Sequence, residues 1–395
     1  MLVPSALLGS LALAAAPTWN AAPAPESVSA PVDVLFLGNS YTGFNDLPGM
    51  LAGLAGSAGI AVNVTANVPG GCTLGSPQGG LQHTQNQSSQ ALLAQGAWDV
   101  VVLQEQSVTP SIAATKNQFM VPAALALGGA ARAASPDVQM LLYQTWGRAN
   151  GGTYCWSQWC SPAFADFDAM QDALTAAYAE TEAALDAAYG VDFATVAPVG
   201  EAWRQFFQEQ PTLPLHGPDG SHPNPQGTYL AACVLFTTLF DQSPVGLGFT
   251  AGLPESDALL LQDLAARAHF APLCGQTAYG EPLAGGSAGW DLALTGDLSL
   301  GSDLTFDASA LPPGADGAWF AVALAPANVP FGDGALLIDA TALVLPLTFL
   351  PAASPTFTGT LPTTPGLAGL ELFAQSASWT GDWQMSGALR LVLCP

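Results

Sequence analysis

The chain has 395 residues, half of them apolar, which is enough for two or three domains with a buried core. Six Lys and Arg stand against thirty Asp and Glu, a formal net charge of −24, and Lys116 is the single lysine. This balance excludes a nucleic-acid binder and argues against docking to anionic lipid, because no basic surface can neutralise phosphates. Only 9% of residues are charged and 42 are Gly, which excludes a coiled coil or a charged disordered chain.

The first predicted element is an apolar run over residues 1–16, too short to span a bilayer of roughly 30 Å as a helix. We expect a secretory signal and a Pro/Ala linker over residues 1–24, and therefore a secreted protein. Prolines obstruct several candidate cleavage sites, so the site of cleavage stays open. No later segment has 18 uninterrupted apolar residues, so we expect no transmembrane segment in the mature chain.

Between residues 32 and about 270, short apolar runs alternate with helical segments. Strands are predicted over residues 32–38, 62–68, 98–104, 138–146 and 191–200. Helices are predicted over residues 47–59, 163–190, 200–210 and 225–240. This alternation predicts an α/β domain over residues 30–272, a three-layer α/β/α sandwich with a parallel sheet whose chemistry lies at the carboxyl ends of the strands.

From Gln276 onwards the pattern changes. Short apolar runs over residues 291–300, 317–325, 334–350 and 387–393 are separated by Pro, Gly and Asp turns. They predict an all-β sandwich over residues 276–395. This part weakly resembles β-rich modules appended to secreted bacterial enzymes, which implies attachment to a cell surface or matrix. The alternative is that it only packs on the first domain and stabilises it.

The six cysteines form an even set, in keeping with an oxidising compartment. Cys155 and Cys160 lie close together in a loop and could close a small ring. A disulfide between Cys274 and Cys394 would link the two ends of the last domain. Cys72 and Cys233 are left, and Cys233 lies in an apolar helical run where a buried thiol is expected. The sequence contains no C-x-x-C pair, the spacing that is typical of zinc sites.

Two turns at the ends of predicted elements carry candidate catalytic groups. The turn GNSYT over residues 38–42 would place Ser40 at a helix N-terminus, where developing negative charge is favoured, although a serine there can also be a simple helix cap. The turn GPDGSHP over residues 217–223 contains His222, whose neutral imidazole could take the serine proton. Asp219, three residues earlier, could accept from its Nδ1–H.

Two further turns could stabilise an oxyanion. The glycine turn at Gly71 could offer a backbone N–H, and the segment LQEQS could offer the amide of Gln104 or Gln106. Gln104 continues the phase of the preceding strand and is favoured slightly over Gln106, which lies in the turn.

Together, GNSYT, the glycine turn and DGSHPNPQGTYLAA resemble SGNH/GDSL-type serine hydrolases over residues 32–270. The resemblance implies a flavodoxin-like fold, and we expect no cofactor and no metal. It also implies Ser40 as nucleophile, His222 as general base, Asp219 as its orienting carboxylate, and the N–H groups of Ser40 and Gly71 as oxyanion donors. Two departures stand out: Gly-Asn-Ser replaces Gly-Asp-Ser, and LQEQS replaces Gly-x-Asn-Asp, which puts the side-chain donor in doubt.

Other residues near predicted strand ends are candidates for substrate binding. They are His83, Trp146, Arg148 and Glu201. Trp156 and Trp159, between two cysteines, could form a platform for stacking on a sugar.

The leading hypothesis is a secreted carboxylic-ester hydrolase that forms an acyl-enzyme and acts on O-acetyl groups of a polysaccharide. The carbohydrate part follows the habit of the family and the Trp-rich loops. The alternatives are an esterase for lipid or polyester, or a catalytically silent carbohydrate-binding or surface protein. A metal-dependent hydrolase would have to use His216, Asp219 and His222 as ligands, an irregular set without an evident fourth member.

Overall fold

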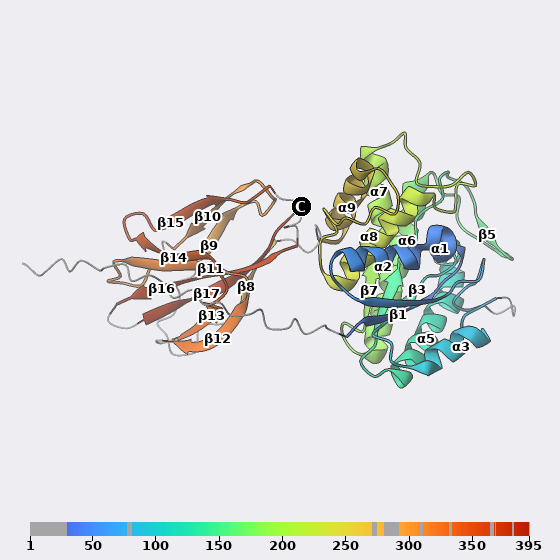
Figure 1. Ribbon diagram of the computed structural model, residues 1–395, viewed down its shortest axis with the longest axis horizontal. Coiled ribbons are helices and arrows are strands. Elements are labelled where there is room, and N and C mark those ends of the chain that lie inside the picture. The colour runs from blue at the N-terminus through green and yellow to red at the C-terminus, as the bar shows by residue number, and fades with distance from the viewer. Residues whose placement is uncertain are drawn as a thin grey trace, which may run out of the picture. The chain divides into compact units, whose positions relative to one another are not determined.

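The computed structural model of the protein describes residues 30–76, 81–270, 275–279, 292–308, 311–331, 334–363, 367, 369–380 and 383–394. The signal and linker expected over residues 1–24 lie outside these ranges. Within them, no helix is both long and apolar enough to cross a bilayer. Figure 1 shows a region of helices and strands and a region of strands alone. The domain boundaries given above stay predictions.

A parallel sheet forms the centre of the first region. Its strands are β1 (Val32–Leu37), β2 (Val62–Asn67), β3 (Val100–Leu103), β4 (Gln139–Tyr143) and β7 (Ala194–Ala197). They are ordered β2-β1-β3-β4-β7, and each neighbouring pair is parallel. This is the doubly wound order of flavodoxin-like folds, so the predicted fold is confirmed. The order reverses between β1 and β3, where such sheets bind their ligands.

Successive residues of the central strands face opposite sides of this sheet. Val34 and Phe36 of β1 belong to one buried core, whereas Leu35 and Leu37 belong to another. All four side chains are fully buried. Burial on both faces explains why these strands read as continuous apolar runs in the sequence.

Helices cover both faces of the sheet (Figure 1). One core includes side chains of α2 (Leu47–Ser57), α7 (Val199–Glu209), α8 (Pro225–Phe240) and α9 (Glu255–Phe270). The other includes side chains of α3 (Gln87–Gln95), α5 (Val121–Ala134) and α6 (Phe167–Tyr189). Shorter helical turns are α1 (Ser40–Gly43), η1 (Phe44–Asp46), α4 (Ala113–Thr115) and η2 (Lys116–Met120). The three predicted layers are therefore confirmed.

The helix predicted over residues 225–240 is confirmed at both ends, and its N-cap Asn224 accepts the N–H of Gly227 at 2.8 Å. The helix predicted over 163–190 begins later, at Phe167, after the N-cap Asp166. Helices α3, α5 and α9 are not predicted from the sequence. None of the three has a strongly one-sided apolar pattern: α3 is mostly polar, α5 contains a Gly-Gly pair, and the apolar residues of α9 are spread around the helix.

The second region is an antiparallel β-sandwich. One sheet has the order β15-β10-β9, from β15 (Thr356–Thr360), β10 (Asp303–Asp307) and β9 (Ala293–Gly296). The other has the order β14-β11-β16-β17-β8, from β14 (Leu343–Pro351), β11 (Gly317–Ala323), β16 (Glu371–Trp379), β17 (Trp383–Val392) and β8 (Gly275–Tyr279). A hairpin of β12 (Pro326–Phe331) and β13 (Gly334–Ile338) accompanies them.

Aromatic rings join the two sheets of this sandwich. Phe320 on β11 is fully buried, and its ring centroid lies 4.6 Å from that of Phe306 and 5.6 Å from that of Phe357, both on the facing sheet. Apolar side chains of both sheets make one core. The predicted all-β sandwich is therefore confirmed.

The cysteines follow the predicted pattern where they are described. Cys155 and Cys160 form a disulfide in a hairpin of β5 (Cys155–Trp156) and β6 (Trp159–Cys160). Cys72 and Cys233 are buried free thiols. Cys394 is disulfide-bonded. Cys274, its expected partner, lies outside the described residues.

Replacing Phe320 tests the sandwich core. We expect Phe320→Ala to lower the free energy of unfolding of this region by about 3–5 kcal/mol, because a large buried ring is lost and a cavity remains. Phe349→Ala is the matched control, since Phe349 is 44% exposed, and it should cost about 1 kcal/mol at most. Denaturant unfolding of the full chain measures both. Equal effects of the two substitutions would contradict the described packing.

Candidate active site

Ser40 lies at the carboxyl edge of the sheet, immediately after β1. It is the first residue of α1, and Asn39 caps this helix by accepting the N–H of Tyr41 at 3.0 Å. The Asn39 amide also donates to the carbonyl of Cys72 at 2.9 Å, which ties the turn after β1 to the glycine turn after β2. Ser40 therefore has a fixed backbone at the switch point of the sheet.

Gly38 is required at the start of this turn. A Cβ on Gly38 would lie 2.5 Å from Oγ1 of Thr42 and 2.8 Å from Oε1 of Gln104. That same Gln104 oxygen accepts the N–H of Asn39 and the hydroxyl of Thr42, each at 2.9 Å. The end of β3 thus holds the end of β1 through one buried amide oxygen.

The predicted general base, His222, lies in the loop between α7 and α8. Gly217 N–H donates to the carbonyl of His222 at 2.7 Å and closes the loop into a tight turn. Inside it, Oδ1 of Asp219 accepts the N–H groups of Ser221 and His222, each at 3.0 Å. These local bonds place the Asp219 carboxylate beside the imidazole three residues later.

The three predicted catalytic side chains form a continuous relay. Ser40 Oγ lies 2.9 Å from His222 Nε2, although the residues are 182 positions apart. His222 Nδ1 lies 2.5 Å from Asp219 Oδ2. Slight burial opposes ionisation of Asp219, but the hydrogen bonds that it accepts from His222 and from the backbone lower its pKa to about 2. The carboxylate is therefore charged and fixes Nδ1–H, which leaves Nε2 to accept the serine proton.

Aromatic rings hold the His222 loop in place. Trp146, a predicted substrate-binding residue, is instead fully buried between Tyr41 and Trp203, with ring centroids 4.7 and 4.0 Å away. Its Nε1–H donates to the carbonyl of Ser221 at 2.9 Å. The prediction that Trp146 binds substrate is corrected, because stacking on both faces leaves it no exposed surface.

A cavity of about 250 Å³ opens beside the relay. It is lined by Asn39, Ser40, Tyr41, Gly71, Gln106, Ser107, Arg148, Asp219, Ser221 and His222. The structure thus brings together most of the predicted site residues. Tyr41, Ser107 and Ser221 were missed by the sequence-based predictions, although each lies within a motif that was singled out.

The cavity lining includes groups that can donate to an oxyanion. The N–H of Ser40 is at the first helical position, where no intrahelical acceptor exists. Gly71 has φ of +69°, a left-handed conformation suited to glycine, and contributes backbone to the cavity wall. Gln106 accepts the N–H groups of Val108 and Thr109 through Oε1, at 3.1 and 3.4 Å, which leaves its Nε2 as a donor.

Gln104, the favoured side-chain donor, does not line this cavity. It is 1% exposed, its Oε1 holds the turn after β1, and its Nε2 donates to the carbonyl of Glu105 at 2.5 Å. Every polar atom of its side chain is therefore engaged within the fold. The preference for Gln104 is therefore corrected, whereas Gln106, the alternative left open by the sequence, lines the cavity.

Two other predicted substrate contacts are structural. His83 is fully buried, its Nε2–H donates to the carbonyl of Gly38 at 2.8 Å, and its Nδ1 accepts from Ser89 Oγ at 2.7 Å. Burial lowers the pKa of His83, which keeps the ring neutral. Glu201 lies in α7, where it contacts the Thr175 hydroxyl and pairs with Arg204 at 3.5 Å. Neither residue lines the cavity, so both predictions are corrected.

Arg148 keeps its predicted place, since it is the one cation among the residues that line the cavity. One guanidinium nitrogen donates to Ser107 Oγ at 3.1 Å, whereas its buried Nε has no partner. Trp156 and Trp159 do not line this cavity; they stack at 5.9 Å and pack against Phe119.

The alternative of a metal site finds no support in the arrangement of the described side chains. Nε2 of His216 lies 2.9 Å from the carbonyl of Gly147, whereas His222 and Asp219 face each other. Within the described ranges, no group of three or more His, Cys, Asp or Glu side chains is placed to hold a metal ion.

No family model and no curated protein matches the sequence. Solved structures similar to the chain include a DUF4886 family protein from Bacteroides uniformis, with 19% identity over 62% of this chain and 96% of that one, and a TM-score of 0.48. A carbohydrate esterase family 3 protein from Talaromyces cellulolyticus has 16% identity, coverages of 53% and 97%, and a TM-score of 0.38. A protein assigned as a GDSL-like lipase from Parabacteroides merdae has 15% identity, the same coverages, and a TM-score of 0.36.

The similarity of the chain to these structures is limited. Their identities are below 20% and their TM-scores below 0.5, so they say nothing about the reaction of this chain. The evidence for a reaction is the geometry of this chain's own side chains.

Substitution of the two glutamines separates their roles. We expect Gln106→Ala to lower kcat for ester hydrolysis by about 10²–10³-fold with little loss of stability, because a donor to the oxyanion is removed. Gln104→Ala should instead lower the melting temperature, because the N–H of Asn39 loses its buried acceptor. Steady-state kinetics and thermal unfolding measure the two effects. Full activity of Gln106→Ala would contradict this assignment.

Proposed function

We propose that the protein is a carboxylic-ester hydrolase that uses Ser40, His222 and Asp219 through an acyl-enzyme. The observation that carries this proposal is the relay from Ser40 Oγ to His222 at 2.9 Å and from His222 to Asp219 at 2.5 Å, at the wall of a cavity that also holds oxyanion donors. A relay without oxyanion donors, or oxyanion donors without a relay, would support ester hydrolysis far less.

The reaction follows from the positions of these groups. Ser40 Oγ attacks the ester carbonyl carbon while its proton passes to His222 Nε2, and Asp219 stabilises the imidazolium. The carbonyl oxygen becomes an oxyanion that accepts from the N–H groups of Ser40 and Gly71 and from Nε2 of Gln106. Collapse breaks the bond to the alcohol, which leaves with the proton from His222. Water then attacks the acyl-serine in the same way, and the acid is released.

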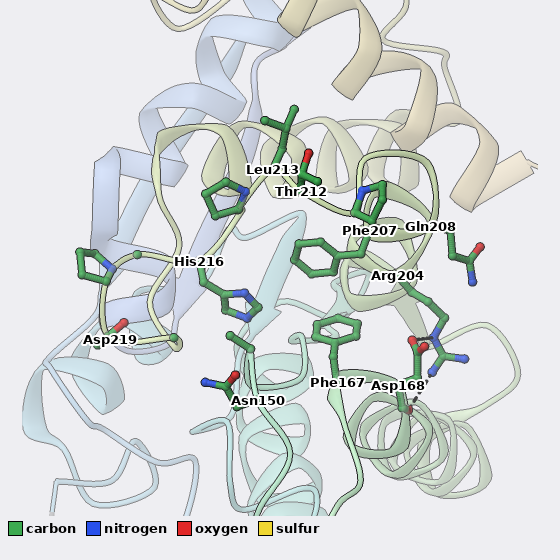
Figure 2. A pocket seen from close by; sticks show the side chains of 16 residues that line it. Asn150, Phe167, Asp168, Arg204, Phe207, Gln208, Thr212, Leu213, His216 and Asp219 are labelled. Atoms are coloured by element: carbon green, nitrogen blue, oxygen red, sulfur yellow. Dashed lines mark hydrogen bonds and ion pairs between the residues drawn. The ribbon is translucent and has the colours of Figure 1, made fainter.

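The space around the relay supports a short acyl group and a larger alcohol. The catalytic cavity measures about 250 Å³, whereas a neighbouring pocket of about 630 Å³ shares Asp219 with it. Figure 2 shows Phe167, Phe207 and His216 directed into this pocket, with Asn150 and Asp219 at its edge. An acetyl group fits the first space and the alcohol part of an ester the second.

The chemistry of the larger pocket favours an uncharged, hydroxyl-rich alcohol. Phe207 and the buried His216 ring lie parallel, with centroids 5.7 Å apart, and present apolar surface. Nε2–H of His216 donates to the carbonyl of Gly147, so its Nδ1 is an acceptor. Arg204 is paired with Asp168 and Asp172, and the acidic chain disfavours anionic ligands. We propose O-acetylated polysaccharide as the substrate, ahead of lipid or polyester esters.

Export and attachment belong to the same proposal. The disulfide between Cys155 and Cys160 supports an oxidising compartment and hence a secreted protein. The C-terminal β-sandwich carries none of the groups that act in the reaction above. We propose that it serves as an accessory domain for attachment to a cell surface or matrix.

Removal of the nucleophile tests the enzyme class. We expect Ser40→Ala to abolish hydrolysis of nitrophenyl acetate and labelling by a fluorophosphonate probe, because both need the serine oxygen beside His222. Ser57→Ala removes an exposed serine at the end of α2 and should leave both unchanged. Folded wild-type protein that resists the probe and leaves the ester intact would favour the catalytically silent alternative.

The larger pocket is tested by its aromatic wall. Phe207→Ala should raise KM for acetylated xylan by about tenfold and leave KM for nitrophenyl acetate within about twofold, because only the larger alcohol reaches this pocket. Phe240→Ala, another half-buried phenylalanine of the same core but outside the pocket, is the control. Better turnover of a medium-chain nitrophenyl ester than of acetylated xylan would favour a lipid or polyester substrate.

A further inference from the structure

One buried carboxyl group next to the catalytic cavity takes no part in the mechanism above. Glu105 follows β3 in the segment LQEQS and is fully buried. No other Asp or Glu of the described ranges is buried. A carboxyl at such a position is costly unless its bonds serve the fold or the site.

The contacts of Glu105 connect the two segments that carry oxyanion donors. Its Oε1 accepts the N–H of Gln106 at 2.6 Å and the N–H of Leu74 at 3.1 Å. Gln106 supplies the side-chain donor, and Leu74 lies three residues after Gly71, which lines the cavity. One oxygen atom therefore fixes the distance between the glycine turn after β2 and the turn after β3.

The second carboxyl oxygen of Glu105 indicates whether this side chain is neutral or ionised. Oε2 of Glu105 is buried and has no hydrogen-bond partner. The titratable groups around it are the thiol of Cys72 and the phenol of Tyr178, and burial raises the pKa of both, so neither supplies a charge. Desolvation raises the pKa of Glu105 from 4.5 to about 8, despite the two N–H donors that favour the ionised form.

We propose that Glu105 is a positioning residue of the oxyanion hole, and that it holds Gly71 and Gln106 in their working geometry as a neutral acid. The proposal rests on the proposed ester hydrolysis. Ionisation of Glu105 would place a negative charge behind the N–H groups that must face the oxyanion, and the transition state would be destabilised. Hydrolysis should therefore decline as the pH rises through about 8.

The test compares the pH dependence of kcat for nitrophenyl acetate in the wild type, Glu105→Gln and Glu105→Ala. Glu105→Gln keeps the accepting oxygen and cannot ionise, so it should retain kcat at pH 7 within about threefold and lose the decline above pH 8. Glu105→Ala frees both segments and should lower kcat by about 10²-fold at nearly unchanged KM. If Glu105→Ala does not fold, the profile of Glu105→Gln decides alone.

Glu182→Gln is the matched control. Glu182 on α6 also accepts a backbone N–H, that of Val196 at 2.9 Å, and burial raises its pKa, but it lies outside the cavity lining. This variant should keep the wild-type decline in alkali. The proposal is overturned if Glu105→Gln declines like the wild type, or if Glu105→Ala keeps its kcat.

Stability provides a readout that does not depend on the reaction. The pKa of Glu105 is higher in the folded protein than its ordinary value of 4.5, so the folded state binds a proton that the unfolded state releases. Wild-type stability should therefore fall between about pH 5 and 8 relative to Glu105→Gln. A constant difference in melting temperature over this range would show that Glu105 is not a neutral acid. Absence of hydrolysis and of fluorophosphonate labelling in the wild type would instead overturn the proposed function.

Discussion

The contact between Ser40 Oγ and His222 Nε2 is the interaction on which the site depends, and two features of the fold create it. The parallel sheet ends β1 at its switch point, where Asn39 caps a short helix and fixes Ser40. The turn after α7 brings Asp219 beside His222 through local backbone bonds, and Trp146 fastens that turn to the buried core. The relay is thus a product of strand order and of one tight loop rather than of neighbouring sequence.

Buried polar side chains, more than apolar packing, set the geometry at the carboxyl edge of the sheet. Gln104 holds the N–H of Asn39, His83 holds the carbonyl of Gly38, and Glu105 joins the turns after β2 and β3. Each of these groups has exchanged water for a protein partner, so its removal leaves a buried donor or acceptor unpaired. Backbone held by such bonds keeps nearby donors preorganised, which an oxyanion requires because the donors then need no rearrangement during the reaction.

The contact between Ser40, His222 and Asp219 could be anticipated from the sequence because each part is local: a serine after an apolar strand, and an aspartate three residues before a histidine. The supporting residues could not be. Gln104 continues the strand phase and reads as a residue of the cavity rim, but its partners Asn39 and Thr42 are more than 60 positions away in the chain. Trp146 likewise ends the predicted strand over residues 138–146, whereas β4 ends at Tyr143, and the stacking of Trp203 from α7 explains why Trp146 is buried. The hydropathy patterns that predict strands and helices do not show which distant residues a polar or aromatic side chain contacts.

The most direct test of the account is to look for the covalent intermediate. The protein is mixed with an activated acetyl ester, quenched in acid within the first turnovers, and digested for mass spectrometry. The account predicts an acetyl group on the peptide that contains Ser40, formed in a burst before steady state and absent from His222→Gln. Steady turnover with no acyl group on that peptide, or with the acyl group on another residue, would contradict it.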